Sequence, residues 1–451
     1  MSLFSKKESA GDAQERTAER RERLLEIING DVTNHCNARC FFCFNDWDSF
    51  KPLNMSMETF ENYLKLQPLM GGTDFMLSCW FEPTINPRFY DMLDLLPEEY
   101  KAKTYFTTNL VTKISEENIE RMCRANVDHI NISLETWDED EYKSITGVEN
   151  THFFENVEKM AIYSKKYGTD LHVITMLTAR NAGHFKELVQ RVHDTLSPSL
   201  HEIRTPYFFI EDTENKEALM KDMLPRKEID RIVEETNELG YGDLLLWDVR
   251  FSRESFESLE KNPQAHVDAS NEIYYRLRVN ADGKARIGNQ KTGTLIDINE
   301  PGDLVARVKQ ELTVLQEKDV SMHQMSMVGL KKKTLQTEKP YWIDSLTIYD
   351  GRFLYIRGWD QAFDLASKKK YERVALLECG REKRLVKLRK EYRKDVAEAL
   401  QSKESDYCGY NGLIDLEGVA DKRYTVKTGI IRGEELILIR EIYRSKDRFR
   451  I

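Results

Sequence analysis

The chain has 451 residues, of which 40% are hydrophobic and 10% aromatic, and a formal net charge of −10 at pH 7. This composition supports a sizeable core and argues against disorder. The acidic balance argues against a nucleic-acid partner, which would require a basic surface. No apolar run reaches roughly 18 residues, so we expect no membrane span. Residues 1–24 are highly charged and are predicted to form a leader rather than a secretory signal.

Short apolar runs alternate with amphipathic stretches over residues 25–230, which we assign to one α/β domain. The predicted strands are Leu25–Gly30, Thr73–Ser78, Lys103–Thr107, His129–Leu134, His172–Met176 and Glu202–Thr205. The predicted helices between them include Met57–Leu69, Ser115–Ala125, Glu139–Thr146, Phe153–Tyr167 and Ala182–Thr195. Six such βα repeats predict a parallel sheet curved into a partial (β/α)6 TIM-like barrel. The chemistry of such barrels lies at the carboxyl ends of the strands.

Two further regions follow the predicted barrel. Residues 231–330 contain a predicted hairpin, Glu272–Val279 with Lys284–Gly288, joined through an Asp-Gly turn that favours positive φ. A Lys/Thr-rich stretch over 331–339 is predicted to be a linker. From 339 to 451, alternating runs predict an antiparallel β-sandwich-like domain, interrupted by a charged helix over Arg384–Ser402.

The chain has seven cysteines, an odd number that predicts free thiols in a reducing cytoplasm. Four of them are scattered, whereas Cys36, Cys40 and Cys43 follow the first predicted strand at spacings of four and three residues. Three thiolates from one loop can bind a cubane iron–sulfur cluster and leave one iron open for chemistry. Zinc is the alternative, with His35 as a fourth ligand, although its position next to Cys36 would strain a tetrahedral site. The spacing favours iron and sulfide without excluding zinc, because soft thiolates suit both.

This spacing, with Phe42 before the third cysteine, resembles the signature of the radical S-adenosylmethionine (radical SAM) enzyme superfamily. The resemblance continues over roughly residues 25–215 at the ends of the predicted strands. It comprises Ser78-Cys-Trp-Phe-Glu82-Pro83, Thr107-Thr-Asn109-Leu110, Ile132-Ser133-Leu134-Glu135 and Asn181. Cys79 and Phe81 replace the glycines of the family's Glu-Pro element, and Leu110 replaces the glycine after Asn109.

The resemblance implies one [4Fe-4S] cluster on the cysteine triad and S-adenosylmethionine as the second cofactor. It implies reductive cleavage of S-adenosylmethionine to a 5′-deoxyadenosyl radical that abstracts hydrogen from the substrate, with flavodoxin or ferredoxin as reductant. The expected cofactor-binding residues are Phe42, Glu82, Asn109, Ser133, Glu135 and Arg180.

The predicted tasks of these residues differ. Glu82 is expected to meet the methionine ammonium. Ser133 and Glu135 share a strand face, so they are expected to meet the methionine moiety and the ribose. Asn109 contacts the cofactor or caps the next helix. Arg180 pairs with the methionine carboxylate or is a solvated surface residue.

Residues for the substrate are less defined, and no catalytic residue is assigned. Asp46, Trp47, Arg204 and Tyr207 are candidates by their position after strands. Cys79 is either a hydrogen-atom donor, as in radical epimerases, or a small buried hydrophobe, which strand parity favours.

The regions after the barrel suggest possible substrate classes. Residues 231–330 resemble the SPASM-like extension of relatives, but residues 124–378 have no cysteine for an auxiliary cluster. The last domain weakly resembles modules of bacterial surface-glycan enzymes, where Trp342 and Trp359 either stack on sugars or anchor the core. A carbohydrate or glycan precursor is therefore the first substrate class, with a peptide or protein side chain and an inactive scaffold as alternatives.

Overall fold

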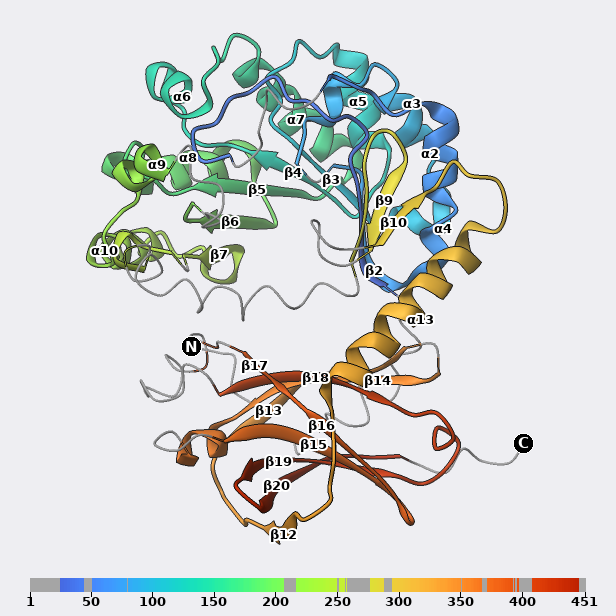
Figure 1. Ribbon diagram of the computed structural model, residues 1–451. Helices are drawn as coiled ribbons and strands as arrows, with labels where there is room; N and C mark the ends of the chain where they lie inside the picture. The colour runs from blue at the N-terminus through green and yellow to red at the C-terminus, as the bar shows by residue number, and fades with distance from the viewer. Residues whose placement is uncertain are drawn as a thin grey trace. The chain divides into compact units, whose positions relative to one another are not determined.

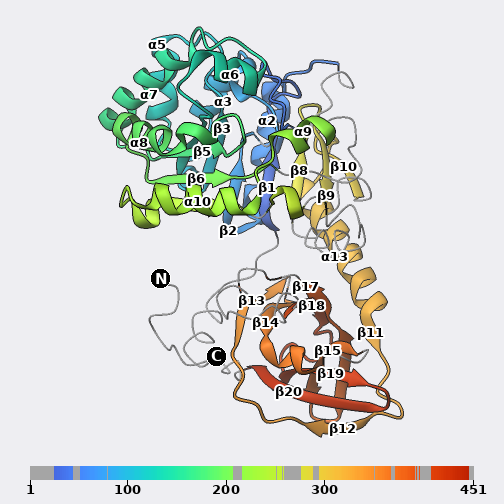
Figure 2. The same ribbon diagram turned by 90° about the vertical axis from the view of Figure 1, so that its left-hand side faces the viewer.

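The computed structural model describes residues 25–43, 51–78, 80–206, 216–249, 251–255, 257, 276–287, 294–349, 351–366, 371–391, 393, 396 and 408–445. These residues form two compact units that meet in sequence between Val305 and Ala306. Figures 1 and 2 show the elements of each unit in views 90° apart.

The first unit is built on a ten-stranded sheet in the order β10-β9-β8-β1-β2-β3-β4-β5-β6-β7. Its strands β1 to β7 each run parallel to the next in sequence. They are β1 Leu25–Gly30, β2 Met70–Met76, β3 Thr104–Thr108, β4 His129–Ser133, β5 Leu171–Met176, β6 Leu200–Arg204 and β7 Leu245–Asp248. The predicted α/β class with a partial barrel is confirmed, and β7 adds a parallel strand that the sequence pattern did not show.

Helices connect the parallel strands. They are α2 Met57–Leu64, α3 Phe89–Asp94, α4 Glu98–Lys101, α5 Glu116–Arg124, α6 Glu139–Thr146, α7 Phe153–Tyr167, α8 Phe185–Leu196, α9 Lys216–Asp222 and α10 Arg226–Asn237. The side chains of Ser56, Ser115 and Asp138 cap α2, α5 and α6 by accepting a backbone N–H of the first turn. Helix α2 ends five residues earlier than predicted, because Pro68 has no backbone N–H to donate to Leu64, and residues Gln67–Leu69 form a short 3-10 helix instead.

Helices α3, α5, α7, α8 and α10 form a layer on one face of the parallel sheet, whereas α9 packs beside the cysteine loop (Figures 1 and 2). Aromatic pairs show the packing: Tyr63 of α2 stacks on Phe75 of β2 at 4.4 Å, and Phe89 of α3 meets Phe106 of β3 at 5.1 Å. Because side chains alternate along a strand, the neighbours of these buried residues point to the opposite face. That face is the interior of the partial barrel.

A three-stranded extension joins the barrel beside β1. Strand β8 Arg276–Val279 runs parallel to β1, and β9 Lys284–Ile287 and β10 Thr294–Asp297 continue the sheet antiparallel. The predicted hairpin is confirmed within the described residues, and Gly283 adopts the positive φ of 82° that its turn requires. The extension is thus continuous with the barrel sheet.

The second unit contains most of helix α13 Leu304–His323 and two β-sheets. One sheet has the order β11-β16-β15-β19-β20-β12 and the other β13-β14-β18-β17. The strands are β11 Gln324–Met325, β12 Lys331–Thr334, β13 Tyr341–Tyr349, β14 Phe353–Asp360, β15 Glu372–Cys379, β16 Glu382–Lys387, β17 Arg389–Glu391, β18 Gly409–Asp415, β19 Thr425–Arg432 and β20 Glu435–Arg444. Buried apolar residues from both sheets form one shared core, as the predicted β-sandwich requires.

Two local predictions for this unit are wrong. Part of the predicted linker forms β12, because β20 offers unpaired backbone groups at the edge of its sheet and β12 pairs with them. Lys333 of β12 also pairs with Glu435. The charged run Arg384–Ser402 begins as strands β16 and β17 rather than as a helix. Val386 and Leu388 of this run are buried in the shared core, so tertiary packing outweighs the helical pattern.

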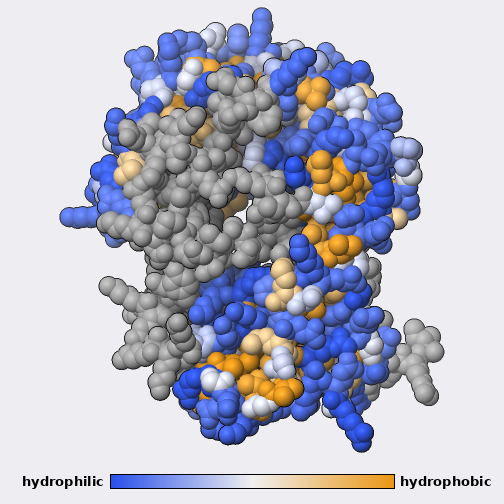
Figure 3. Space-filling view, in the orientation of Figure 1, coloured by the Kyte–Doolittle hydropathy of each residue, from blue (hydrophilic) through white to orange (hydrophobic). Residues whose placement is uncertain are grey.

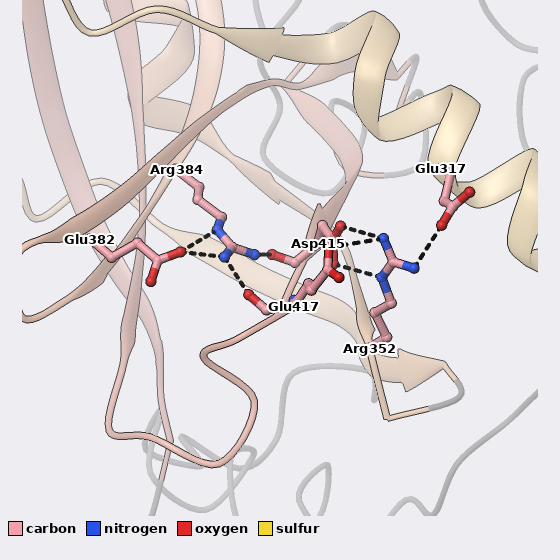
Figure 4. A network of polar contacts seen from close by, with 6 residues as sticks. All are labelled: Glu317, Arg352, Glu382, Arg384, Asp415 and Glu417. Atoms are coloured by element: carbon pink, nitrogen blue, oxygen red, sulfur yellow. Dashed lines mark hydrogen bonds and ion pairs between the residues drawn. The ribbon is translucent and has the colours of Figure 1, made fainter.

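A polar network fastens α13 to the sandwich (Figure 4). Arg352 makes two hydrogen bonds to Asp415, at 3.1 and 2.9 Å, and one to Glu317 of α13 at 2.7 Å. Arg384 contacts Glu382 and the backbone carbonyls of Asp415 and Glu417. The network therefore joins the helix to both sheets of this unit.

The surface drawn in Figure 3 is mainly hydrophilic, with apolar residues in separate areas. The most exposed large apolar side chains are Val328, Ile162 and Met322, at 91%, 64% and 60%. Single exposed apolar side chains of this kind are ordinary for folded proteins. Among the described residues, no helix is both long and apolar enough to cross a membrane.

Candidate active site

The cysteine loop follows β1 and is held on two sides. Gly30 ends β1 directly beneath the Tyr63 ring, where an added Cβ would lie 2.4 Å from Tyr63 Cζ. Farther along, Arg39 N donates to Thr146 O at 2.7 Å, and Phe41 N donates to Ile145 O at 3.1 Å. The loop therefore uses the free carbonyls at the end of α6 as its anchors.

The three thiols lie close enough to influence one another electrostatically. Burial raises the pKa of Cys36 to about 12, with the charges of Glu82 and Cys43 adding to the effect. Burial also raises the pKa of Cys40, and the charge of Glu135 contributes next. Thiols in this setting hold their protons until a metal replaces them.

Asn109, at the end of β3, contacts the cysteine loop directly. Its Nδ2 lies 3.5 Å from Cys36 Sγ and donates to Asn37 Oδ1 at 3.0 Å. Its Oδ1 accepts Val111 N at 3.1 Å, a local turn bond. The Asn109 side chain therefore both stabilises a local turn and lies beside the Cys36 thiol.

Glu82 is buried, with 3% of its surface exposed, and accepts four hydrogen bonds. Oε1 accepts from Thr84 N, Thr84 Oγ1 and Thr108 Oγ1, and Oε2 accepts Asn109 N at 2.7 Å. Burial raises the pKa of Glu82, while these hydrogen bonds oppose the rise. In the structure the carboxylate ties the ends of β2 and β3 together, and its expected bond to the methionine ammonium stays a prediction.

Glu135 and Ser133 lie at the end of β4. Glu135 is buried and its Oε2 accepts Met176 N at 2.7 Å, while burial raises its pKa to about 8. Asn181 donates to the Glu135 carbonyl at 2.9 Å and so fixes the strand end. Ser133 is half-buried on the same strand face, so both residues border the barrel interior next to the cysteine loop.

Arg180 is paired within the protein. Its Nε and Nη2 donate to the two carboxylate oxygens of Asp222, at 3.0 and 2.6 Å, and its guanidinium lies 4.0 Å from the Phe41 ring centroid. The Arg180 side chain is 28% exposed and already pairs with Asp222, with which the methionine carboxylate would compete. Phe42 packs in an apolar cluster with Leu219 and Met223.

The substrate candidates are only partly described. Arg204 lies at the end of β6 and donates to Glu202 at 2.6 Å. Asp46, Trp47, Cys79 and Tyr207 lie outside the described residues. In the second unit Trp359 is buried against Val396 and Cys408, whereas Trp342, opposite it on β13, is 44% exposed.

The sequence interpretation missed a contact group at the end of β1. Asp31, 1% exposed, accepts Trp80 N at 3.0 Å and pairs with Arg278 of β8 at 2.8 Å. The available signal was the acidic residue directly after a buried strand. Its arginine partner lies 247 positions away, beyond the reach of local patterns.

A parallel α/β barrel with three thiols in the loop after its first strand fits the partial-barrel class of iron–sulfur proteins. Residues 31–192 match the model of the radical SAM superfamily. The part of the chain over residues 31–192 is therefore similar to the radical SAM superfamily.

Curated relatives match parts of the chain. The probable GTP 3′,8-cyclase of Thermococcus kodakarensis is 25% identical over 37% of this chain and 53% of its own length. The probable GTP 3′,8-cyclase of Pyrococcus horikoshii is 30% identical over 28% of this chain and 39% of its own, and the GTP 3′,8-cyclase of Clostridium botulinum is 26% identical over 30% and 44%. The chain thus spans about half or less of the length of these relatives.

Solved structures are similar at a lower level. Streptococcus suis SuiB bound to S-adenosylmethionine has a TM-score of 0.47 and 14% identity over 65% of this chain and 67% of its own. Native anSMEcpe with bound AdoMet has a TM-score of 0.43 and 15% identity over 63% and 79%. The similarity to the radical SAM superfamily thus rests on the sequence match over residues 31–192.

Radical SAM enzymes bind a [4Fe-4S] cluster and S-adenosylmethionine, and the residues present fit the cluster. Three soft thiols from one loop suit iron and sulfide, and the side-chain amide Nδ2 of Asn109 lies 3.5 Å from Cys36 Sγ. Among the described residues, no group of three or more His, Cys, Asp or Glu is arranged to hold a single metal ion. A cubane is wider than one ion, so its ligands lie farther apart.

Proposed function

We propose that this chain is a radical SAM enzyme that reductively cleaves S-adenosylmethionine and uses the 5′-deoxyadenosyl radical to take a hydrogen atom from its substrate. The observation that carries the proposal is the meeting of the Cys36 loop and Asn109 at the carboxyl edge of the parallel sheet. In parallel barrels this edge is where the reactive groups gather.

In this proposal Cys36, Cys40 and Cys43 hold the cluster, which supplies the electron for cleavage when bound. Ser133 and Glu135 border the space beside it and offer polar groups to the methionine and ribose parts of the cofactor. Burial raises the pKa of the Glu135 carboxyl group to about 8. At neutral pH this group can therefore donate as well as accept a hydrogen bond. Phe42, within its apolar cluster, helps exclude water from one side of the loop.

For the substrate we infer a carbohydrate or glycan precursor. Support comes from the second unit, a two-sheet sandwich with the exposed Trp342 on one face. An exposed aromatic face offers apolar contact to a ligand ring. The alternative is a peptide or protein side chain, and relatives named GTP 3′,8-cyclase add nucleotides to the classes that a substrate screen should contain.

The proposed partner is a one-electron reductant such as flavodoxin or ferredoxin, and the proposed compartment is the cytoplasm. Both follow from the requirement for a reduced cluster on free thiols.

The test of cleavage is anaerobic reconstitution followed by dithionite and S-adenosylmethionine. We expect about four irons per chain, as one cubane would give, and slow release of 5′-deoxyadenosine without substrate. A fully loaded cluster that releases none would favour the inactive scaffold.

The substrate class is tested separately by glycan binding to the intact chain. Binding that Trp342→Ala abolishes and Trp342→Phe retains would support the glycan assignment. Failure of a broad glycan panel, with turnover of a peptide instead, would replace it with the peptide alternative.

A further inference from the structure

The extension strand β8 reaches the candidate site through one side chain, Arg278. Strand β8 lies beside β1, with Arg278 opposite Asn29 and Asp31 N bonded to Val279 O at 2.9 Å. This register brings Arg278 to the carboxyl end of β1, where the cysteine loop begins.

Arg278 contacts two segments there. Its Nε and Nη2 both donate to Asp31 Oδ2, at 3.2 and 2.8 Å, and its guanidinium carbon lies 3.5 Å from the centroid of the Trp80 ring. The side chains of Arg278 and Asp31 are only 14% and 1% exposed. An ion pair shielded from solvent is screened little by salt, and removing one partner leaves a buried charge.

The contacts continue from Trp80 to the cysteine loop. Asp31 Oδ1 accepts Trp80 N at 3.0 Å, and Trp80 precedes Glu82 by two residues. The Glu82 carboxylate accepts the backbone N–H of Asn109, and the side-chain amide of Asn109 lies beside Cys36 Sγ. Arg278 is therefore linked to the thiol through packed and hydrogen-bonded groups without touching it.

We propose that Arg278 is a positioning residue for S-adenosylmethionine: by fixing Asp31 and Trp80, it sets the segment around Trp80–Glu82 in the form that binds the cofactor. The inference rests on the proposed function. It makes strand β8 of the extension part of the cofactor site, because β8 supplies the Arg278 cation that pairs with Asp31 and stacks on Trp80. The cysteine ligands themselves do not depend on Arg278.

The experiment compares the reconstituted wild-type chain with Arg278→Ala, Arg278→Lys, Arg278→Met and the control Arg276→Ala. Arg276 is an exposed residue two positions earlier on the same strand. Three quantities are measured: iron per chain, the melting temperature, and the S-adenosylmethionine concentration that half-converts the electron paramagnetic resonance spectrum of the reduced cluster.

We expect Arg278→Ala to keep its iron. The S-adenosylmethionine concentration that half-converts its spectrum should be about tenfold higher than for the wild type, as for other residues that orient binding groups without touching the ligand. Arg278→Lys should recover part of this affinity, because the ammonium keeps the ion pair but loses the fork and the flat stacking. Arg276→Ala should match the wild type. Combining Arg278→Lys with Trp80→Leu should give less than the sum of the two effects, since both act through one contact.

Unchanged cofactor affinity in Arg278→Ala would overturn the inference. So would full recovery by Arg278→Met, which would show that packing alone is required. If Arg278→Ala fails to fold, the comparison of Arg278→Lys with Arg278→Met decides in the same way. If the wild type itself, fully loaded, shows no spectral response to S-adenosylmethionine, the proposed function fails and the inference with it.

Discussion

The carboxylate of Glu82 accepts the backbone N–H of Asn109 at 2.7 Å, and this bond joins the ends of β2 and β3 beside the cysteine loop. Asn109 is then held with its side-chain amide 3.5 Å from Cys36 Sγ. A buried acidic residue after one strand thus determines where a polar residue after the next strand points.

Glu82→Gln should lower both stability and cofactor cleavage. The amide replaces a charged acceptor of several hydrogen bonds and turns a donor toward N–H or O–H groups, at a cost of about 2 kcal/mol in the free energy of unfolding. Urea unfolding and 5′-deoxyadenosine release measure the two effects. The control Glu158→Gln, on an exposed position of α7, should change neither. A stable, fully active Glu82→Gln would contradict the bond's importance.

Replacing Cys36, Cys40 and Cys43 together by Ala should abolish iron and sulfide binding and the visible charge-transfer absorbance. Their thiols are the soft ligands of the loop, and the sequence has no further cysteine before Cys79 to replace them. The matched control is Cys123→Ala, a buried cysteine on α5 that should retain iron. Native protein that contains zinc instead of iron would refute the cluster assignment.

Gly30→Ala should destabilise the barrel by about 2 kcal/mol, because the new methyl group overlaps the Tyr63 ring. Urea denaturation measures the loss. Tyr63→Leu removes the ring, along with its hydrogen bonds to the Ile28 and Met76 carbonyls, so it is itself destabilising. The double variant should be less unstable than the sum of the two single changes predicts. Strict additivity would show that the overlap is relieved elsewhere.

Acid should loosen the β12 edge of the second unit through Glu378. Partial burial acts to raise the pKa of Glu378, but Lys332 and Lys427 outweigh it and bring the pKa to about 2, below its ordinary value of 4.5. A depressed folded-state pKa gives stability that is complete above 4.5 and is lost as the pH falls toward 2.

Glu378→Gln should therefore speed amide hydrogen exchange in β12 and β15 at pH 6. The free energy of local opening should fall by about 1 kcal/mol at most. At pH 3 the difference from wild type, compared at equal pH, should shrink. An equal difference at both pH values would show that the lysine pairs contribute nothing.

The sequence by itself determined the α/β class, the cysteine triad and most of the strand ends that border the site. These follow from local rules: alternation places residues on faces, capping residues begin helices, and the ligands of the triad lie within eight positions of one loop. Helices α6 and α7 begin and end where the pattern predicted them.

Only the tertiary structure decided how the polar groups are shared. Arg180 pairs with Asp222. Glu82 accepts hydrogen bonds from two threonine hydroxyls and two backbone N–H groups. Arg278 of the extension pairs with Asp31. Each buried charge must find a partner as the chain packs, and the nearest partner in space can be hundreds of positions away in sequence. For the same reason the charged run after Arg384 became strands, because burial of its apolar residues in the sandwich core outweighed its local helical preference.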